Sequence, residues 1–276
     1  MMVTTATRVR RPLVAGYYYP RDAEALRVQL EAFTSGGRRD AESPARGAIV
    51  PHGSYAFSGA IAGAAYQQLR IPARCIVLAP NHAGAGARWS VMAHGAYASP
   101  LGELPVDEAL AERLRSTCPW LEEDERAQRA EHAIEVQVPF LQWCGPMALS
   151  FVPIVINSEQ PEEWARCADA LAEVLEEEDD VFLLASSDLS HYERREVATE
   201  QDRLVLGAIE RLDVEELTQQ VRARAIAMCG LAPVACALSA LARLGATRAE
   251  VVRYGTSADA GGDPHSVTGY AGVVIR

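Results

Sequence analysis

The chain has 276 residues, of which 49% are hydrophobic and 23% charged, and its formal net charge at pH 7 is −11. A chain of this size can bury a large core, and no linker, repeat or low-complexity tract divides it. We therefore predict a single domain over residues 1–276. The acidic balance argues against a nucleic-acid or membrane partner, because binding to phosphates depends on a basic patch.

Two further features of the composition narrow the function. The sequence contains no lysine, which excludes a Schiff base, a P-loop lysine, a kinase-type lysine and a Ser-Lys nucleophile. The six cysteines form no CxxC pair and lack the dense spacing of a secreted disulfide scaffold, so we expect most of them to be buried. The apolar stretch 13–19 is too short for a signal peptide or a spanning helix, and we expect a cytoplasmic protein.

The expected elements alternate between strands and helices. Helical spacing predicts helices over 22–33, 60–69, 106–114, 127–143, 162–177, 196–212, 214–223 and 229–244. Three segments, 48–52, 76–82 and 181–191, each begin with an apolar run that predicts a strand and end in a histidine. Further strands are predicted over 89–94, 149–156, 251–254 and 270–275. This order predicts an α/β fold with a central sheet sandwiched between helices.

Three of the predicted strands lead into a histidine. His52, His82 and His191 each follow the carboxyl end of an apolar run. An open α/β sheet binds its ligands in the crevice outside the carboxyl ends of its strands, so the three imidazoles can meet at one point. Their convergence predicts a metal site, since imidazole is the commonest metal ligand.

The first two histidines share one local pattern, an apolar strand, a proline and then a turn. Pro51 ends the strand and Gly53 permits a sharp turn, which places His52 at a strand-to-helix corner. A loop histidine bonded to a carbonyl is the alternative. The glycines after His82 could instead form a phosphate loop, but they do not fit GxGxxG and no lysine accompanies them.

A carboxylate accompanies the third histidine. Asp188 and His191 are three residues apart and would share one face of a helical turn, where the carboxylate could fix the imidazole tautomer and raise its basicity. Such a pair could act as a general base, or its carboxylate could support a histidine that binds a metal. In the alternative, Ser187 or Asp188 only caps a helix.

A fourth histidine lies in the segment 131–140, which we interpret as helical. On such a helix His132 would point towards the pocket while Ile134 and Val138 pack. The segment is not an HExxH motif, because Val136 occupies the position of the second histidine. In the alternative, which is equally open, His132 is a buried histidine that makes its hydrogen bonds within the core and has no role in a site.

Taken together, these motifs resemble the Memo family, represented in prokaryotes by AmmeMemoRadiSam system protein B. The resemblance runs nearly end to end through residues 11–20, 51–52, 55, 58–59, 80–82, 100–102, 131–141, 186–192, 229–230, 254, 257 and 259. The family is related in fold to the class III extradiol (LigB-type) dioxygenases. The resemblance therefore implies one α/β domain with a pocket at the strand ends.

The resemblance also implies roles for particular residues. His52 and His82 match the two histidine ligands of the oxygenases, and Cys229 stands where their carboxylate ligand would be. His191 matches the acid/base histidine, with Asp188 beside it. The metal expected is Fe(II), although a thiolate is a softer ligand that favours zinc or copper relative to iron.

Five more residues of these motifs are expected in the substrate pocket or behind the ligands: His132, Ser54, Tyr55, Asn81 and Tyr192. At the first motif the family reads Pro-His-Ala-Gly-Tyr, whereas this chain has Gly53 and Ser54 between the histidine and the tyrosine. The change could alter the turn and bring a hydroxyl donor near the metal.

Two classes of function follow. The first is a non-haem iron oxygenase-like enzyme that acts on a small substrate, which could be aromatic. The second is a non-catalytic metal-binding, peptide-binding or redox module, and a metal-dependent hydrolase is a third, weaker possibility. Family context implies a functional link to a radical SAM protein and an AMMECR1-like protein.

Overall fold

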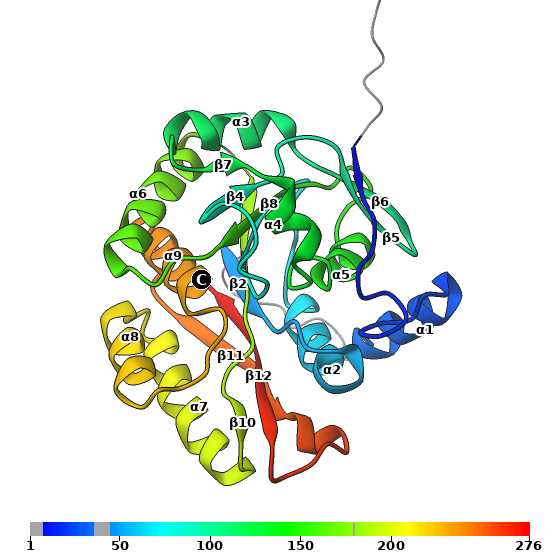
Figure 1. The fold of residues 1–276 in the computed structure, drawn as a ribbon, viewed down its shortest axis with the longest axis vertical. Helices are drawn as coiled ribbons and strands as arrows, with labels where there is room; N and C mark the ends of the chain where they lie inside the picture. Colours follow the sequence, from blue (N-terminus) through cyan, green and yellow to red (C-terminus); the bar gives the residue numbers. More distant parts are fainter. Residues whose placement is uncertain (1–7, 36–44, 179) are drawn as a thin grey trace, which may run out of the picture.

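The structure is a computed structural model that describes residues 8–35, 45–178 and 180–276. Its first half contains β1 (Val9–Arg10), α1 (Ala23–Phe33), β2 (Gly47–Val50), α2 (Tyr55–Tyr66), β3 (Arg74–Pro80), β4 (Trp89–Val91), β5 (Ala96–Ser99), β6 (Gly102–Pro105), α3 (Glu108–Thr117), β7 (Glu122–Glu123), α4 (Glu125–Ala130) and α5 (Gln137–Cys144). The second half contains β8 (Ser150–Ile156), α6 (Pro161–Glu177), β9 (Val181–Ser186), β10 (His191–Glu193), α7 (Arg195–Glu210), α8 (Val214–Ala223), α9 (Leu231–Arg243), β11 (Ala249–Thr256), the 3-10 turn η1 (Ser257–Ala260) and β12 (Val267–Ile275). Figure 1 shows the elements around one central sheet.

The central sheet is mixed, with a parallel core. The strand order is β10-β12-β2-β9-β3-β8-β4-β7, and β11 pairs with β12. The neighbours β2, β9, β3 and β8 run parallel, and they are buried almost throughout, as expected for strands covered on both faces. A separate small sheet is formed by β1, β5 and β6.

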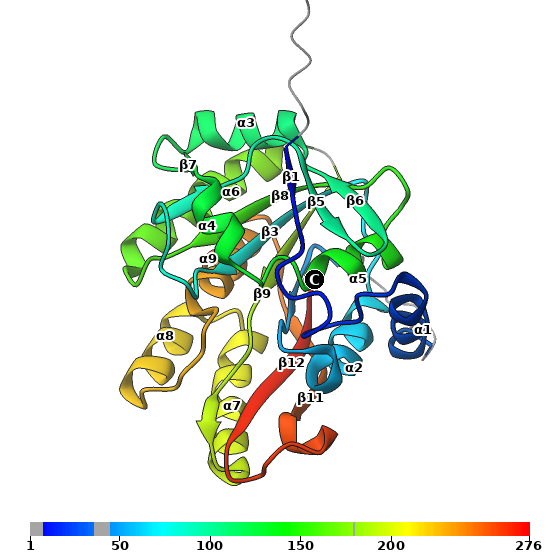
Figure 2. The ribbon, with the colours of Figure 1, turned by 45° about the vertical axis from the view of Figure 1, so that its right-hand side comes forward.

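Helices cover both faces of this sheet, and two close approaches at glycines identify which helix lies on which face. A Cβ added at Gly47 in β2 would lie 2.5 Å from Leu241 Cδ1 of α9, whereas one at Gly272 in β12 would lie 2.8 Å from the Ile61 carbonyl of α2. Gly47 pairs with Ile275, three residues after Gly272, so the two glycines face opposite sides. Helix α9 thus covers one face and α2 the other (Figures 1 and 2).

The α/β fold with one central sheet confirms the fold class expected from the sequence. Helix α8 has the predicted bounds, and α1, α6 and β8 differ from theirs by one residue. Helix α2 begins five residues before the predicted start, and the strand expected over 89–94 ends at Val91. Among the described residues, no helix has both the length and the apolar character needed to cross a bilayer.

The helix predicted over 127–143 is wrong, because the chain forms two helices here. Helix α4 ends at Ala130, and α5 begins only at Gln137. Glu131 is extended, with φ −102° and ψ 132°, and its carboxylate accepts the Ala133 N–H at 2.7 Å. Pro139 lacks the N–H that a helix interior requires, but it is tolerated in the first turn of α5. The interruption creates the loop 131–136.

Candidate metal centre

Three imidazoles gather where the parallel strands end. His52 follows β2, His82 follows β3, and His132 lies in the loop 131–136. One ring nitrogen from each can be chosen so that all three lie within 4.8 Å of one another. The ring centroids are 5.1 Å apart for His52 and His82, and 4.7 Å apart for His82 and His132. This arrangement can hold a metal ion.

The hydrogen bonds around His52 fix its tautomer. Its Nδ1 lies 2.9 Å from Ser186 Oγ, which donates to the Ala133 carbonyl and accepts from Gln137 Nε2. Because the single hydroxyl proton is used for the carbonyl, His52 Nδ1 carries the proton and Nε2 keeps its lone pair. Burial, followed by the neighbouring His82 and His132, lowers the pKa of His52 well below its usual value. His52 is therefore a neutral potential ligand through Nε2.

His82 is fixed by a carboxylate that the sequence analysis did not single out. Glu131 accepts the His82 backbone N–H at 2.6 Å and its Nδ1 at 2.9 Å. Burial opposes charge on both groups, but their hydrogen bond and attraction dominate. They raise the pKa of His82 and lower the pKa of Glu131 to about 2. With Nδ1 bound to a carboxylate, His82 presents Nε2 as metal-ligating histidines commonly do.

His132 completes the cluster from the interrupted helix. Its ring lies 5.0 Å from that of Tyr18, and its Nδ1 is 3.4 Å from Glu131 Oε1. Burial lowers the pKa of His132, although the Glu131 charge opposes this shift. The sequence analysis expected His132 near the pocket but did not assign it as a ligand.

A buried ion pair anchors the loop that carries Glu131 and His132. Arg10 forms an ion pair with Glu135, and both side chains are almost completely buried. The same guanidinium donates to the carbonyls of Gln128 at 3.2 Å and Glu131 at 2.7 Å. Glu135 also accepts the Tyr19 hydroxyl at 2.8 Å. The N-terminal segment therefore holds the loop in place.

Cys229 lies at the edge of the three-histidine cluster, two residues before α9 begins. Its Sγ is 3.2 Å from His52 Nε2 and 3.8 Å from the Asp188 carbonyl. Burial, followed by the charge of Asp188, raises the pKa of the thiol well above its usual value. The thiol faces the same nitrogen that would bind a metal. Resemblance alone selected this cysteine, since no local pattern marks it.

Asp188 and His191 approach each other, but the helical turn expected between them is wrong. Residues 187–190 are not helical and His191 begins β10, so the alternative helix cap is also absent from this segment. The Asp188 Oδ2 lies 4.0 Å from His191 Nε2 and 3.9 Å from His52 Nε2. His191 Nδ1 donates to the Ala227 carbonyl at 2.7 Å, which directs Nε2 towards Asp188.

Asp188 also supports the turn after β2. Its Oδ1 accepts the backbone N–H groups of His52 at 2.8 Å and Gly53 at 3.2 Å. Burial raises the pKa of Asp188, while these hydrogen bonds oppose the rise. The carboxyl group therefore links the three-histidine cluster to His191.

Three of the other expected residues lie around the cluster in different ways. Tyr55 is buried and donates to the Val136 carbonyl at 2.8 Å, so it supports the loop from behind. Ser54 is the N-cap residue of α2 but makes no side-chain cap bond. Tyr192 is 83% exposed and has a positive φ of 61°, an uncommon conformation for a bulky residue, beside His191.

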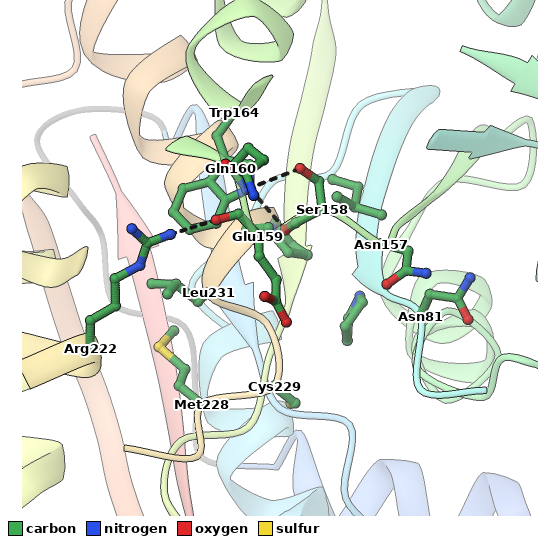
Figure 3. Close-up of a pocket in the computed structure, with 14 residues that line it drawn as sticks. Asn81, Asn157, Ser158, Glu159, Gln160, Trp164, Arg222, Met228, Cys229 and Leu231 are labelled. Carbon is green, nitrogen blue, oxygen red and sulfur yellow. Dashed lines mark hydrogen bonds between the residues drawn. The ribbon is translucent and has the colours of Figure 1, made fainter. Parts of the chain in front are cut away.

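Asn81 lines a cavity of about 540 Å³ next to the cluster. Its walls come from the ends of β3 and β8, from α6 and α8, and from the start of α9: Pro80, Asn81, Ile156, Asn157, Ser158, Glu159, Gln160, Trp164, Arg222, Met228, Cys229, Leu231, Ala232 and Pro233. Figure 3 shows these side chains surrounding the open space, with Cys229 at one end. The cavity thus reaches the metal centre through Cys229 and through Asn81, the neighbour of His82.

Glu131 and Ser186 contact the three-histidine cluster, and the sequence analysis did not assign either of them. Both belonged to motifs that were singled out, and each binds the Nδ1 of a histidine in the cluster. Glu131 could have been found from the sequence, because it is a carboxylate directly before His132. For Ser186, a hydroxyl at the last residue of a buried strand was the signal.

Comparison with known proteins assigns the family. The family described as Memo-like protein matches residues 10–274 of this chain. The chain belongs to the Memo family. Its relatives include a MEMO1 family protein of Methanopyrus kandleri, which is 34% identical over 279 residues and is matched across 97% of this chain and 99% of its own length. Another, from Aquifex aeolicus, is 36% identical over 268 residues, with 97% and 99% covered.

A solved structure shares the fold of this Memo family member. The crystal structure of the uncharacterized protein JW3007 from Escherichia coli K12 superposes with a TM-score of 0.51 at 15% identity. The match covers 83% of this chain and 98% of the other. At this identity the likeness concerns the fold alone.

Proposed function

We propose that this protein is a metal-dependent enzyme with non-haem iron oxygenase-like chemistry that acts on a small substrate. The observation that carries the proposal is the three-histidine cluster, in which His52 and His82 each use Nδ1 for a protein partner and present Nε2 to the same point. Burial lowers the pKa of His52 and of His132, so these two rings favour the neutral form that binds a metal.

The donor set fits a divalent transition metal. Histidine nitrogens suit iron, zinc and copper, and the supporting bonds from Ser186 and Glu131 orient two of the rings. We assign His52, His82 and His132 as the nitrogen ligands, with Cys229 Sγ as a further donor beside His52. Fe(II) is the metal proposed, with copper and zinc as alternatives.

The remaining groups handle protons and substrate. A bound metal would supply an electrophilic centre with open positions for substrate. His191 Nε2 lies 4.0 Å from Asp188 Oδ2, where it could accept or return a proton, and the Ala227 carbonyl orients the ring. The adjoining cavity gives a small molecule access to this point.

One observation favours a second function, a non-catalytic metal-binding or redox module. As a thiolate bound to a metal, Cys229 beside His52 would be a soft donor that favours zinc or copper and would itself be open to oxidation. In that case the same residues would hold a metal without turnover, and peptide binding would use the same pocket.

Anaerobic purification with metal analysis, followed by addition of nitric oxide to the Fe(II) form, tests the proposal. An iron-nitrosyl EPR signal is expected if iron binds with an open position. Stoichiometric zinc with no iron uptake would contradict the oxygenase proposal and favour a hydrolase or a zinc-binding module. Iron that binds without forming a nitrosyl would favour the non-catalytic module.

A further inference from the structure

The cavity beside the three-histidine cluster has an arginine at its rim. Arg222, near the end of α8, lies over the Trp164 ring at 5.6 Å and donates to the Glu159 carbonyl through Nη2. These two contacts hold the guanidinium in one place (Figure 3). A guanidinium has five N–H donors in a planar fork, so others remain to bind an anionic ligand group.

A carboxylate lies beside Arg222 in the same space. The Glu159 carboxylate extends into the cavity in Figure 3 and makes no hydrogen bond or ion pair within the described parts of the chain. Asn81 also lines the cavity, but its Nδ2 donates to the Ala85 carbonyl at 2.8 Å and its Oδ1 is buried, so this amide offers no accessible acceptor. The cavity therefore presents one cation and one anion to a ligand.

Apolar side chains form part of the walls, alongside polar ones. Ile156 ends β8, Trp164 comes from α6, and Met228 and Leu231 flank Cys229 at the start of α9. The volume of about 540 Å³ lies in the range of small-molecule pockets. A ligand that fits this space would have an apolar body and would touch Cys229 at the metal centre.

We propose that the cavity binds a small molecule of the amino-acid class. Arg222 takes its carboxylate, Glu159 takes its ammonium group, and the apolar part of the lining takes its side chain. A phosphate would meet the Glu159 charge, a simple amine would meet Arg222, and a purely apolar molecule would leave both charges without a partner. The role of this molecule as a substrate rests on the proposed function, whereas its binding does not.

Calorimetry on chelator-treated, metal-free protein tests the binding. The probes are L-phenylalanine and L-leucine, compared with 3-phenylpropionate, which lacks the ammonium group, and 2-phenylethylamine, which lacks the carboxylate. At least one amino acid should bind about tenfold or more tightly than either truncated analogue, because each analogue leaves a polar group of the site unpaired. If neither amino acid exceeds the analogues, the proposal is overturned.

Two variants assign the charges. Arg222→Gln should weaken amino-acid binding about tenfold or more, and Glu159→Gln should weaken binding of the amino acid but not of 3-phenylpropionate. Arg224→Gln is the matched control, since Arg224 contacts Gln220 and does not line the cavity. Unchanged binding in Arg222→Gln would overturn the proposal.

A parallel titration with Co(II) separates this proposal from the proposed function. Arg222→Gln should take up cobalt like the unmodified protein, because the residue does not contact the histidines. If cobalt binds but no amino acid does, the cavity proposal fails alone. If an amino acid binds but no metal does, the metal-enzyme proposal fails and the cavity proposal stands.

Discussion

The Glu131 carboxylate binds His82 at two points, with Oε2 on the backbone N–H at 2.6 Å and Oε1 on Nδ1 at 2.9 Å. Oε1 also accepts the Ala133 N–H at 2.7 Å. One buried side chain therefore joins the loop after β3 to the loop 131–136. The positions of His82 and His132 depend on the same carboxylate.

Replacing Glu131 by Gln should weaken metal binding. The amide removes the charge that favours the Nδ1–H tautomer of His82, and losing such a supporting carboxylate costs about 10–100-fold in metal affinity. Competition with a chromophoric chelator measures the change. Glu122→Gln is the control, because Glu122 is exposed and lies outside the cluster. Equal affinity in both variants would show that Glu131 does not support a ligand.

The same carboxylate should make folding stability depend on pH. Its pKa is lowered to about 2 in the folded protein, so its contribution is fully present above the unfolded pKa of about 4.5 and is lost as pH falls towards 2. At pH 7 that contribution is at most roughly 3 kcal/mol. Urea unfolding should show Glu131→Gln less stable at pH 7, with the difference shrinking at pH 3. A constant difference would contradict the shift.

The choice between His132 and Cys229 as third ligand can be decided by paired variants. If the three imidazoles hold the metal, His132→Ala should reduce bound metal well below one equivalent while Cys229→Ser retains it. Metal analysis after desalting measures both. The opposite result would support the set His52, His82 and Cys229 that the family resemblance implies.

His191→Ala should retain metal but lose turnover. The imidazole is bound to the Ala227 carbonyl and directed at Asp188, and it is not part of the three-histidine cluster. Metal content and oxygen uptake by the iron form in the presence of substrate are the two measurements. His265→Ala, which changes an exposed histidine, serves as control. Loss of metal from His191→Ala would make His191 a ligand.

Gly53 should be sensitive to added volume. A Cβ there would lie 2.7 Å from Tyr270 Cε1 and 2.9 Å from its hydroxyl, so Gly53→Ala should destabilise the fold by about 1–3 kcal/mol. Tyr270→Ala costs stability through a cavity, but it removes the clash. A double-mutant cycle by urea unfolding should therefore give a combined loss smaller than the sum. Strict additivity would show that the two residues do not compete for space.

The sequence predicted the parts of this fold that depend on local pattern. The runs 48–50 and 76–79 read as strands because they are apolar and bounded by turn residues, and their histidines were expected at one edge for that reason. The loop 131–136 was missed because its conformation depends on Arg10 and His82, which are distant in the chain. The contact between Cys229 and His52 also spans the chain, and only family resemblance pointed to it.

The anchoring of the loop by Arg10 has a consequence for the order of assembly. Arg10 is synthesised more than a hundred residues before its partners Gln128, Glu131 and Glu135. Strand β1 therefore cannot form these contacts until more than a hundred further residues have been made. A nascent chain stopped before residue 128 would contain β2 and β3 with both their histidines, but it would have nothing to hold the rings in place.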